Sequence, residues 1–184
     1  TALPEFITMI ILILLVFLFL ANITLHTSAL LSYFIGGAPF VPTPITVLET
    51  MLALADIQSD ELVYDLGCGD GRLLIEVNLT YKAQDVGIEI SALFCWIARI
   101  KANFYQAVIT VIQDDLMEFD FSNADVVFCY LMPEQLKQLK KKFSLLKKGC
   151  RIISLRFEVP GWKPLCHVSR NDRIQQPPIF KYQL

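Results

Sequence analysis

The pattern of apolar and polar residues sets the start of the chain apart from the rest. Phe6 to Ala21 reads FITMIILILLVFLFLA without a charged side chain. Continuing to Leu25 gives about 20 residues, enough to cross a hydrocarbon core as a helix. A buried core helix would show a polar stripe, and a signal peptide would begin with basic residues, whereas only Glu5 carries a side-chain charge there. We therefore predict a membrane-spanning anchor, with a connector reaching residue 37.

Residues 38–184 are predicted to form one domain, which begins with a stiff, proline-rich segment and a helix. Thr43 is a good N-cap residue, and Pro44 is a natural first helical residue. The helix that follows has apolar residues at helical spacing, namely Ile45, Leu48, Leu52 and Ala55.

Strands and helices then alternate along the chain. Apolar strands are expected at residues 62–66, 86–90, 108–112, 125–130 and 151–157. The helices between them are expected at 72–77, from a Ser91 cap to about residue 103, and before Gly149 with Leu136, Leu139, Phe143 and Leu146 buried. This alternation with short connections predicts an α/β fold with a doubly wound, mostly parallel sheet. Two short tail strands, 165–168 and 179–183, are expected to close one edge as a hairpin.

The strongest local signal is the segment Asp65-Leu66-Gly67-Cys68-Gly69-Asp70-Gly71, at the end of the first strand. Its three glycines let the backbone turn sharply and approach a ligand closely, at the place where open α/β sheets bind ligands. The spacing G-x-G-x-G differs from the G-x-G-x-x-G of dinucleotide-binding proteins. Asp65 would also repel a pyrophosphate but attract a cationic aminoacyl cofactor. Nicotinamide-dependent oxidoreduction therefore stays only a remote alternative.

Acidic residues also follow the second and third predicted strands. Glu89 lies about 20 residues past the loop, where a carboxylate can accept hydrogen bonds from both hydroxyls of a ribose. Asp114 or Asp115 can accept a hydrogen bond from an adenine amino group, with Leu116 or Met117 over the ring. An exposed strand-end acid and a solvated turn are the alternative interpretations of these two places.

Charge and cysteine content exclude several classes of protein. The net charge of −2 argues against a broad nucleic-acid-binding surface. The cysteines form no C-x-x-C pair or Cys/His cluster, so we expect neither a metal site nor a disulfide framework, and free thiols suit a reducing compartment. The five cysteines are Cys68, Cys95, Cys129, Cys150 and Cys166.

These motifs together resemble those of the class I S-adenosylmethionine-dependent methyltransferases. The apolar N-terminal helix, F-V-P-T-P, V-Y-D-L-G-C-G-D-G-R, G-I-E-I and R-F-x-x-P-x-W-x-P are similar to a narrower family, the small membrane-associated protein-lysine methyltransferases. That family includes the mitochondrial enzymes that act on the ATP synthase c-subunit and the adenine nucleotide translocase. The resemblance covers about Pro39 to Pro164 and implies a Rossmann-like sheet with S-adenosyl-L-methionine as cofactor.

The resemblance also assigns roles to residues. Asp65 and the loop glycines would hold the methionine part of the cofactor, Glu89 the ribose, and Asp115 with Leu116 the adenine. Tyr130 and Glu134 would line the substrate channel and position the amine. The expected cofactor-binding set is Thr43, Pro44, Asp65, Gly67, Cys68, Gly69, Gly71, Glu89, Ile90, Asp114, Asp115 and Leu116.

The expected acceptor is a lysine of a membrane-embedded or membrane-adjacent protein, with no metal and no nucleic acid as partner. A membrane-associated lipid or quinone methyltransferase is the alternative, and an inactive cofactor-binding scaffold is a further one. Enzymes that methylate amino groups of bases usually carry N/D-P-P-Y/F after the fourth strand, where this chain reads Cys129-Tyr130-Leu131-Met132-Pro133. We expect a single-pass protein whose catalytic domain faces the cytosol or an equivalent reducing, S-adenosylmethionine-containing compartment.

The sequence leaves the roles of two further features undecided. Trp162 suits either the core or the site entrance. A group of lysines before the fifth strand suits either a solvated face or contact with anionic headgroups. These are Lys137, Lys140, Lys141, Lys142, Lys147 and Lys148.

Overall fold

The structure is a computed structural model that describes residues 2–34, 40–172 and 175–184. It divides into two compact units, Thr1–Phe40 and Val41–Leu184. The predicted boundary between residues 37 and 38 lies outside the described residues, as do Gly36 and Gly37 of the predicted connector and Pro39 of the proline-rich segment.

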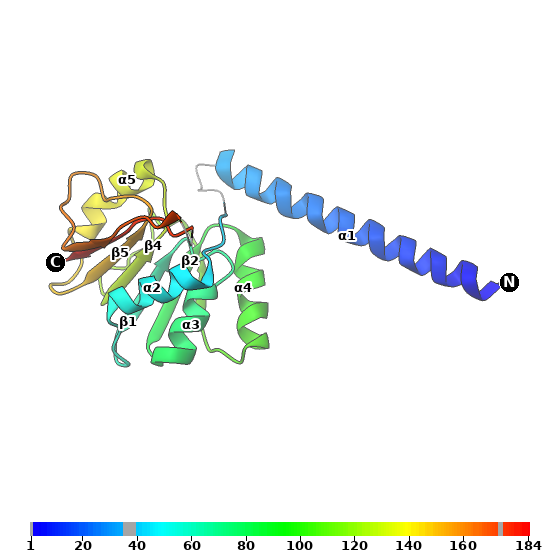
Figure 1. Cartoon of the computed structure of the whole chain (residues 1–184), viewed down its shortest axis with the longest axis horizontal. Coiled ribbons are helices and arrows are strands. Elements are labelled where there is room, and N and C mark those ends of the chain that lie inside the picture. Colours follow the sequence, from blue (N-terminus) through cyan, green and yellow to red (C-terminus); the bar gives the residue numbers. More distant parts are fainter. Residues whose placement is uncertain (1, 35–39, 173–174) are drawn as a thin grey trace. The chain divides into compact units, whose positions relative to one another are not determined.

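The first unit is a long helix, α1, which runs from Ala2 to Phe34 (Figure 1). Its window Ile7–Thr24 has a mean hydropathy of 2.8 with no residue buried, so by length and composition it can cross a membrane. The prediction of a connector from residue 26 is wrong for residues 26–34, which continue the helix. No glycine or proline interrupts this stretch, and the Thr27 hydroxyl donates to the Ile23 carbonyl oxygen at 2.9 Å inside the helix.

The second unit contains one seven-stranded sheet in the order β3-β2-β1-β4-β5-β7-β6. The first five strands are parallel, β7 is antiparallel to β5, and β6 is antiparallel to β7. The predicted mostly parallel sheet and tail hairpin are therefore confirmed. The strands are β1 Leu62–Leu66, β2 Gln84–Glu89, β3 Thr110–Gln113, β4 Val126–Cys129, β5 Arg151–Leu155, β6 Cys166–Val168 and β7 Ile179–Gln183.

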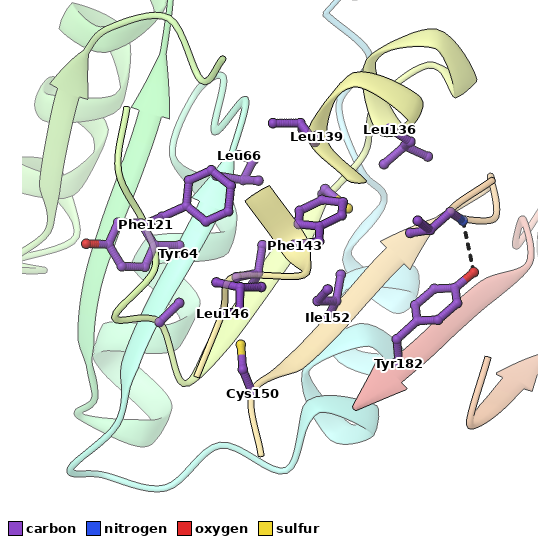
Figure 2. Packing of buried hydrophobic residues seen from close by; sticks show 14 of the residues in the cluster. Tyr64, Leu66, Phe121, Leu136, Leu139, Phe143, Leu146, Cys150, Ile152 and Tyr182 are labelled. Atoms are coloured by element: carbon purple, nitrogen blue, oxygen red, sulfur yellow. Dashed lines mark hydrogen bonds between the residues drawn. The ribbon is translucent and has the colours of Figure 1, made fainter. Parts of the chain in front are cut away.

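Helices cover both faces of this sheet. The helices α2 (Ile45–Ala55) and α3 (Arg72–Tyr81) pack on one face, against Val63 and Val126 among others. Helix α4 (Ala92–Phe104) contacts α3, β2 and β3. Helix α5 (Pro133–Phe143) packs on the opposite face, where Figure 2 shows Leu139 and Phe143 pointing toward the sheet. The fold is therefore doubly wound.

The core on the α5 face also settles the place of Trp162. Its ring lies 6.4 Å from that of Phe143 and 6.1 Å from that of Tyr182, between ring centroids. The Tyr182 hydroxyl accepts a hydrogen bond from the Val159 N–H at 2.9 Å, drawn as a dashed line in Figure 2. Trp162 is thus partly buried and packs against the core, in the chain between β5 and β6.

Several element boundaries differ from the prediction for local reasons. Pro44, not Thr43, is the N-cap of α2, because its carbonyl oxygen accepts the first helical hydrogen bonds. Ile45 is 58% exposed, and the buried face uses Val47 and Met51 with the predicted Leu48, Leu52 and Ala55. Strand β3 begins at Thr110 rather than at residue 108, where Val108 is exposed.

Two predicted ends near α5 and β5 also shift. Helix α5 ends at Phe143 with Ser144 as its C-cap, so the role predicted for Gly149 at the helix end is wrong. The Gly149 N–H instead donates to the Leu184 carbonyl oxygen, and Leu146 is buried in the turn after the helix. Strand β5 stops at Leu155 because the next residue, Arg156, has a φ of +73°.

Candidate active site

The glycine segment forms a tight loop between β1 and α3. Gly67, Gly69 and Gly71 have φ values of +80°, +53° and +73°, which L side chains rarely adopt. The N–H groups of Gly67 and Cys68 both donate to the Ile88 carbonyl oxygen, at 2.9 and 3.1 Å. The loop is therefore fastened to the carboxyl end of β2.

The strand order places this loop at the switch point of the sheet. Strand β1 lies between β2 and β4, and the chain order reverses direction on either side of it. Ligands of open α/β sheets bind outside the carboxyl ends of strands at such a point. The register pairs Leu66 with Ile88 and Cys129, so Glu89 and Tyr130 follow at the same edge.

The carboxylate of Glu89 is held by the backbone around it. One oxygen accepts from the Gly69 N–H at 3.0 Å and the other from the Ser91 N–H at 2.9 Å. Burial raises the pKa of Glu89, against the effect of these hydrogen bonds. Each oxygen keeps a further lone pair, so the fixed carboxylate can still accept hydrogen bonds from two neighbouring hydroxyls.

Asp65, at the end of β1, is a buried carboxyl without a cation beside it. Burial, together with the nearby charges of Glu89 and Asp70, raises its pKa to about 7. No ion pair within the part of the chain that the structure describes involves Asp65 or Glu89. A cationic group brought to this edge would stabilise both carboxylates, so the site fits a positively charged aminoacyl ligand.

Asp70, also in the loop, is compensated by two cations. Its oxygens accept from Arg72 Nε at 2.9 Å and Nη2 at 2.7 Å, and from Lys101 Nζ at 2.7 Å. Burial alone would raise the pKa of Asp70, but these hydrogen bonds and charges lower it. Arg72 Nη1 also donates to the Thr43 carbonyl oxygen at 2.8 Å. The guanidinium thus ties the segment before α2 to the glycine loop.

This Asp70–Arg72–Lys101 cluster has no counterpart among the predicted site residues. The motif G-D-G-R contains Asp70 and Arg72, so the sequence already indicated an acidic and a basic side chain close together in the loop. Lys101 lies on α4, 31 residues from Asp70, and no local pattern connects the two. The Arg72 hydrogen bond brings Thr43 beside the loop, while the contact of Thr43 and Pro44 with the cofactor stays a prediction.

Asp114 and Asp115 follow β3 at the same edge. The Asp114 N–H donates to the Glu89 carbonyl oxygen at 3.2 Å, which places the pair beside Glu89. Asp114 Oδ1 accepts from the Asp115 N–H, and Asp115 Oδ1 accepts from the Met117 N–H, both at 2.8 Å. Both side chains thus stabilise a turn, and Leu116 is partly buried against the core. Their contact with adenine stays a prediction.

Tyr130 directly follows β4 and is half-buried. Its hydroxyl accepts a hydrogen bond from Arg156 Nη1 at 3.3 Å. Glu134 is the second residue of α5 and is exposed, and Ile90 is 43% exposed beside Glu89. Tyr130 is therefore anchored at the carboxyl edge, while the role of Glu134 stays a prediction.

Arg156 was missed by the sequence analysis. Its backbone lies in the left-handed region, and its N–H donates to the Pro178 carbonyl oxygen at 2.7 Å. The guanidinium lies 5.7 Å from the ring centroid of Phe157. The sequence offered one indication of this residue, because Arg156 begins the motif R-F-x-x-P-x-W-x-P.

The cysteines and the lysines near α5 complete the predicted groups, and the contact of Cys68 with the cofactor stays a prediction. All five cysteines are free; burial raises the pKa of the Cys68 thiol, and that of Cys129 to about 12, so neither is a thiolate. Among the described residues, no group of three His, Cys, Asp or Glu side chains is arranged to hold a metal ion. Of the six lysines near α5, Lys142 donates to the Phe119 carbonyl oxygen and Lys147 pairs with Asp125.

Comparisons with known proteins agree with this geometry. The ANTKMT methyltransferase domain matches residues 65–166. A protein-lysine N-methyltransferase from Saccharolobus islandicus is 36% identical over 153 residues, which is 81% of this chain and 95% of that protein. The mouse adenine nucleotide translocase lysine N-methyltransferase is 28% identical over 140 residues, 74% of this chain and 61% of that protein.

A solved structure adds the fold and a bound ligand. It is described as an RNA methyltransferase from Salinibacter ruber in complex with S-adenosyl-L-homocysteine. It is 34% identical, has a TM-score of 0.73, and covers 78% of this chain and 93% of its own.

Proposed function

This chain belongs to the ANTKMT methyltransferase family and is an S-adenosylmethionine-dependent methyltransferase, and from that premise we propose that it methylates lysine side chains of a membrane-associated protein. The observation that supports the lysine acceptor best is the Saccharolobus relative, because the match spans nearly all of that protein and most of this one. The mouse relative is also named for lysine methylation of a protein.

In this proposal the carboxyl edge of the sheet binds the cofactor through charges and backbone groups. Asp65 faces the α-ammonium group, and Glu89, oriented by Gly69 and Ser91, accepts from the ribose hydroxyls. The left-handed glycines allow the loop backbone to lie against the ligand. When bound, the cofactor supplies a methyl group on a sulfonium, which is already activated toward attack by an amine.

The protein must then align the lysine amine and favour its neutral form. A lysine has an ordinary pKa of about 10.4, and a nearby positive charge disfavours its protonated state. The Arg156 guanidinium, which donates to the Tyr130 hydroxyl, is such a charge at this edge. Because Arg156 occupies one lone pair of the Tyr130 oxygen, the hydroxyl can receive the amine N–H on the other. Tyr130 thus positions the acceptor.

Tyr130→Phe is expected to lower kcat about fivefold, since one hydrogen bond contributes about 1 kcal/mol and 1.36 kcal/mol is a factor of ten. The dissociation constant of S-adenosylmethionine should stay unchanged, which calorimetry measures. Glu134→Gln is the companion variant, because it neutralises the other predicted channel residue without changing its size. An unchanged kcat for Tyr130→Phe would remove the tyrosine from acceptor positioning.

The membrane part of the proposal is supported by α1. Its apolar window of 18 residues is long enough to span a bilayer, and a site tethered to a membrane meets acceptors that lie in or beside it. We propose a single-pass protein whose catalytic unit faces the cytosol or an equivalent compartment that contains S-adenosylmethionine. The free cysteines are consistent with a reducing environment.

The acceptor class is tested by incubating the full chain with methyl-labelled S-adenosylmethionine and a membrane extract. The label is expected in protein, at lysine. Label in lipid or quinone would favour the alternative acceptor. RNA is also tested as an acceptor, because the Salinibacter structure is described as an RNA methyltransferase. A net charge of −2 and the sequence CYLMP after β4, in place of N/D-P-P-Y/F, argue against it.

A further inference from the structure

Helix α4 presents large apolar side chains to solvent along one face. Trp96, Ile100 and Phe104 are 59%, 48% and 78% exposed. Their spacing of four residues places them above one another on the helix surface. The chain continues this surface with Tyr105 and Val108, which are 52% and 84% exposed. We call these five residues the α4 stripe.

The stripe does not contribute to the fold of the catalytic unit. The buried face of α4 uses other residues: Phe94, Cys95, Ala98 and Ala102. The stripe is nevertheless held in place. Asn78 of α3 donates to the Val108 carbonyl oxygen and accepts from the Val108 N–H, both at 2.9 Å. The Phe104 and Tyr105 rings also contact each other edge-on, with centroids 5.2 Å apart. A fixed, exposed aromatic patch of this kind marks an interaction surface.

We propose that the α4 stripe docks into the interfacial region of an anionic membrane. Tryptophan and tyrosine, with an apolar ring and one polar group, are the residues that gather at membrane interfaces. Among the described contacts, no hydrogen bond uses the Trp96 indole or the Tyr105 hydroxyl, so both can bind headgroups or interfacial water.

The charges around the stripe suit an anionic surface. The chain as a whole has 18 acidic and 16 basic residues, but residues 90–113 contain Arg99 and Lys101 and no acid. Lys101 is engaged by Asp70, and Arg99 donates to the Val111 carbonyl oxygen, so its positive charge is not neutralised by a carboxylate there. Lys82, exposed at the end of α3, adds a second free cation near Asn78. Anionic lipid would therefore meet no repelling carboxylate on this helix.

The inference rests on the proposed membrane anchor, because the anchor makes a weak docking contact effective. Ten residues separate Phe34 of α1 from Ile45 of α2, and ten residues span at most about 35 Å. A surface tethered at that range needs little affinity of its own.

Docking through α4 would also orient the site. The helix begins after Ser91, whose N–H binds Glu89, so the membrane contact and the proposed ribose-binding carboxylate belong to one rigid stretch.

The test uses the two tryptophans of the full chain as depth probes. Trp162→Phe leaves Trp96 as the sole tryptophan, and Trp96→Phe leaves Trp162, which is partly buried against the core. Both variants are reconstituted into vesicles of phosphatidylcholine with phosphatidylserine, with and without brominated acyl chains. The emission maximum of Trp96 is expected at a shorter wavelength than that of a water-exposed tryptophan in a reference peptide without detergent. The intensity of the Trp96 emission should fall severalfold with brominated lipid. Brominated lipid should leave the Trp162 emission unchanged.

Each alternative gives a different result. Trp96 that is quenched by aqueous iodide but not by brominated lipid would overturn the docking proposal. Trp96 that is shielded from both quenchers would mean that protein, such as a second copy, covers the stripe, which also overturns it. Carbonate washing of the same vesicles reports on the anchor separately. A chain that stays in the membrane with an unquenched Trp96 disproves docking alone, and a chain that washes off disproves the anchor.

Discussion

Replacing Asp65 by asparagine is expected to weaken S-adenosylmethionine binding by one to two orders of magnitude. The carboxylate has no cation beside it among the described ion pairs, and it lies on the loop that we propose to hold the aminoacyl part. Loss of a charge-assisted hydrogen bond costs about 1.5–3 kcal/mol, and each 1.36 kcal/mol is a factor of ten. Titration calorimetry of both proteins measures the difference.

The same substitution should stabilise the ligand-free protein. The pKa of Asp65 is about 7 in the fold because of burial, above its ordinary value of 3.8. The folded state therefore favours the protonated acid, and its stability falls as the pH rises from about 4 to about 7, then stays level. Asparagine has no such penalty. The melting temperature of Asp65→Asn should exceed that of the wild type most clearly above pH 7.

The pH dependence of binding gives a further check with a matched control. A cationic ligand binds the ionised acid, so wild-type affinity should fall below about pH 7, by at most about tenfold per pH unit. Asp65→Asn should show no such dependence. Asp85 is also buried, with its pKa raised to about 6 by burial, but it lies near the start of β2 and away from the site. Asp85→Asn should bind the cofactor like the wild type; equal affinity of Asp65→Asn and wild type would refute the assignment of Asp65.

Gly87→Ala should have the second largest effect, on both stability and binding. A Cβ at Gly87 would lie 2.5 Å from Leu74 Cδ1 and 2.6 Å from Cys68 Sγ. Both neighbours are buried, and Cys68 belongs to the glycine loop. Overpacking of this kind costs about 1–3 kcal/mol. Relief of the contact must move the loop, so we expect weaker cofactor binding together with a lower free energy of unfolding, measured by denaturant titration.

Gly149→Ala separates crowding from backbone strain. Gly149 has a φ of +89°, but a Cβ there meets no atom within 4 Å. Alanine at that position should cost about 1–2 kcal/mol of stability through strain and leave cofactor affinity unchanged. If Gly87→Ala also left the affinity unchanged, the close packing of β2 beneath the loop would be irrelevant to binding.

The sheet was predictable because its strands are short apolar runs bounded by loop residues. β1 and β7 have the predicted bounds, and Ser91 caps α4 as expected. Local spacing also predicted that Glu89 would end the second strand, and the structure shows that this end of β2 lies against the glycine loop. The features that depend on local sequence, namely the spacing of apolar residues and the residues that form turns, could therefore be predicted.

The missed features depend on contacts between distant parts of the chain. The Thr43 carbonyl is held by Arg72, 29 residues away, and Asp70 is compensated by Lys101, 31 residues away. The raised pKa of Asp65 depends on burial by elements from both sides of β1. Arg156 ends β5 through a left-handed backbone that a non-glycine residue seldom adopts, so its type gave no warning.

The lysine acceptor is tested most directly by quantitative mass spectrometry of membrane proteins. Cells that contain the wild-type chain are compared with cells that contain Asp65→Asn, a variant that keeps the protein and weakens cofactor binding by one to two orders of magnitude. We predict a lysine that gains methyl groups with the wild type and gains far fewer with the variant. Unchanged lysines throughout, with a methylated lipid, quinone or RNA in the wild-type cells instead, would contradict it.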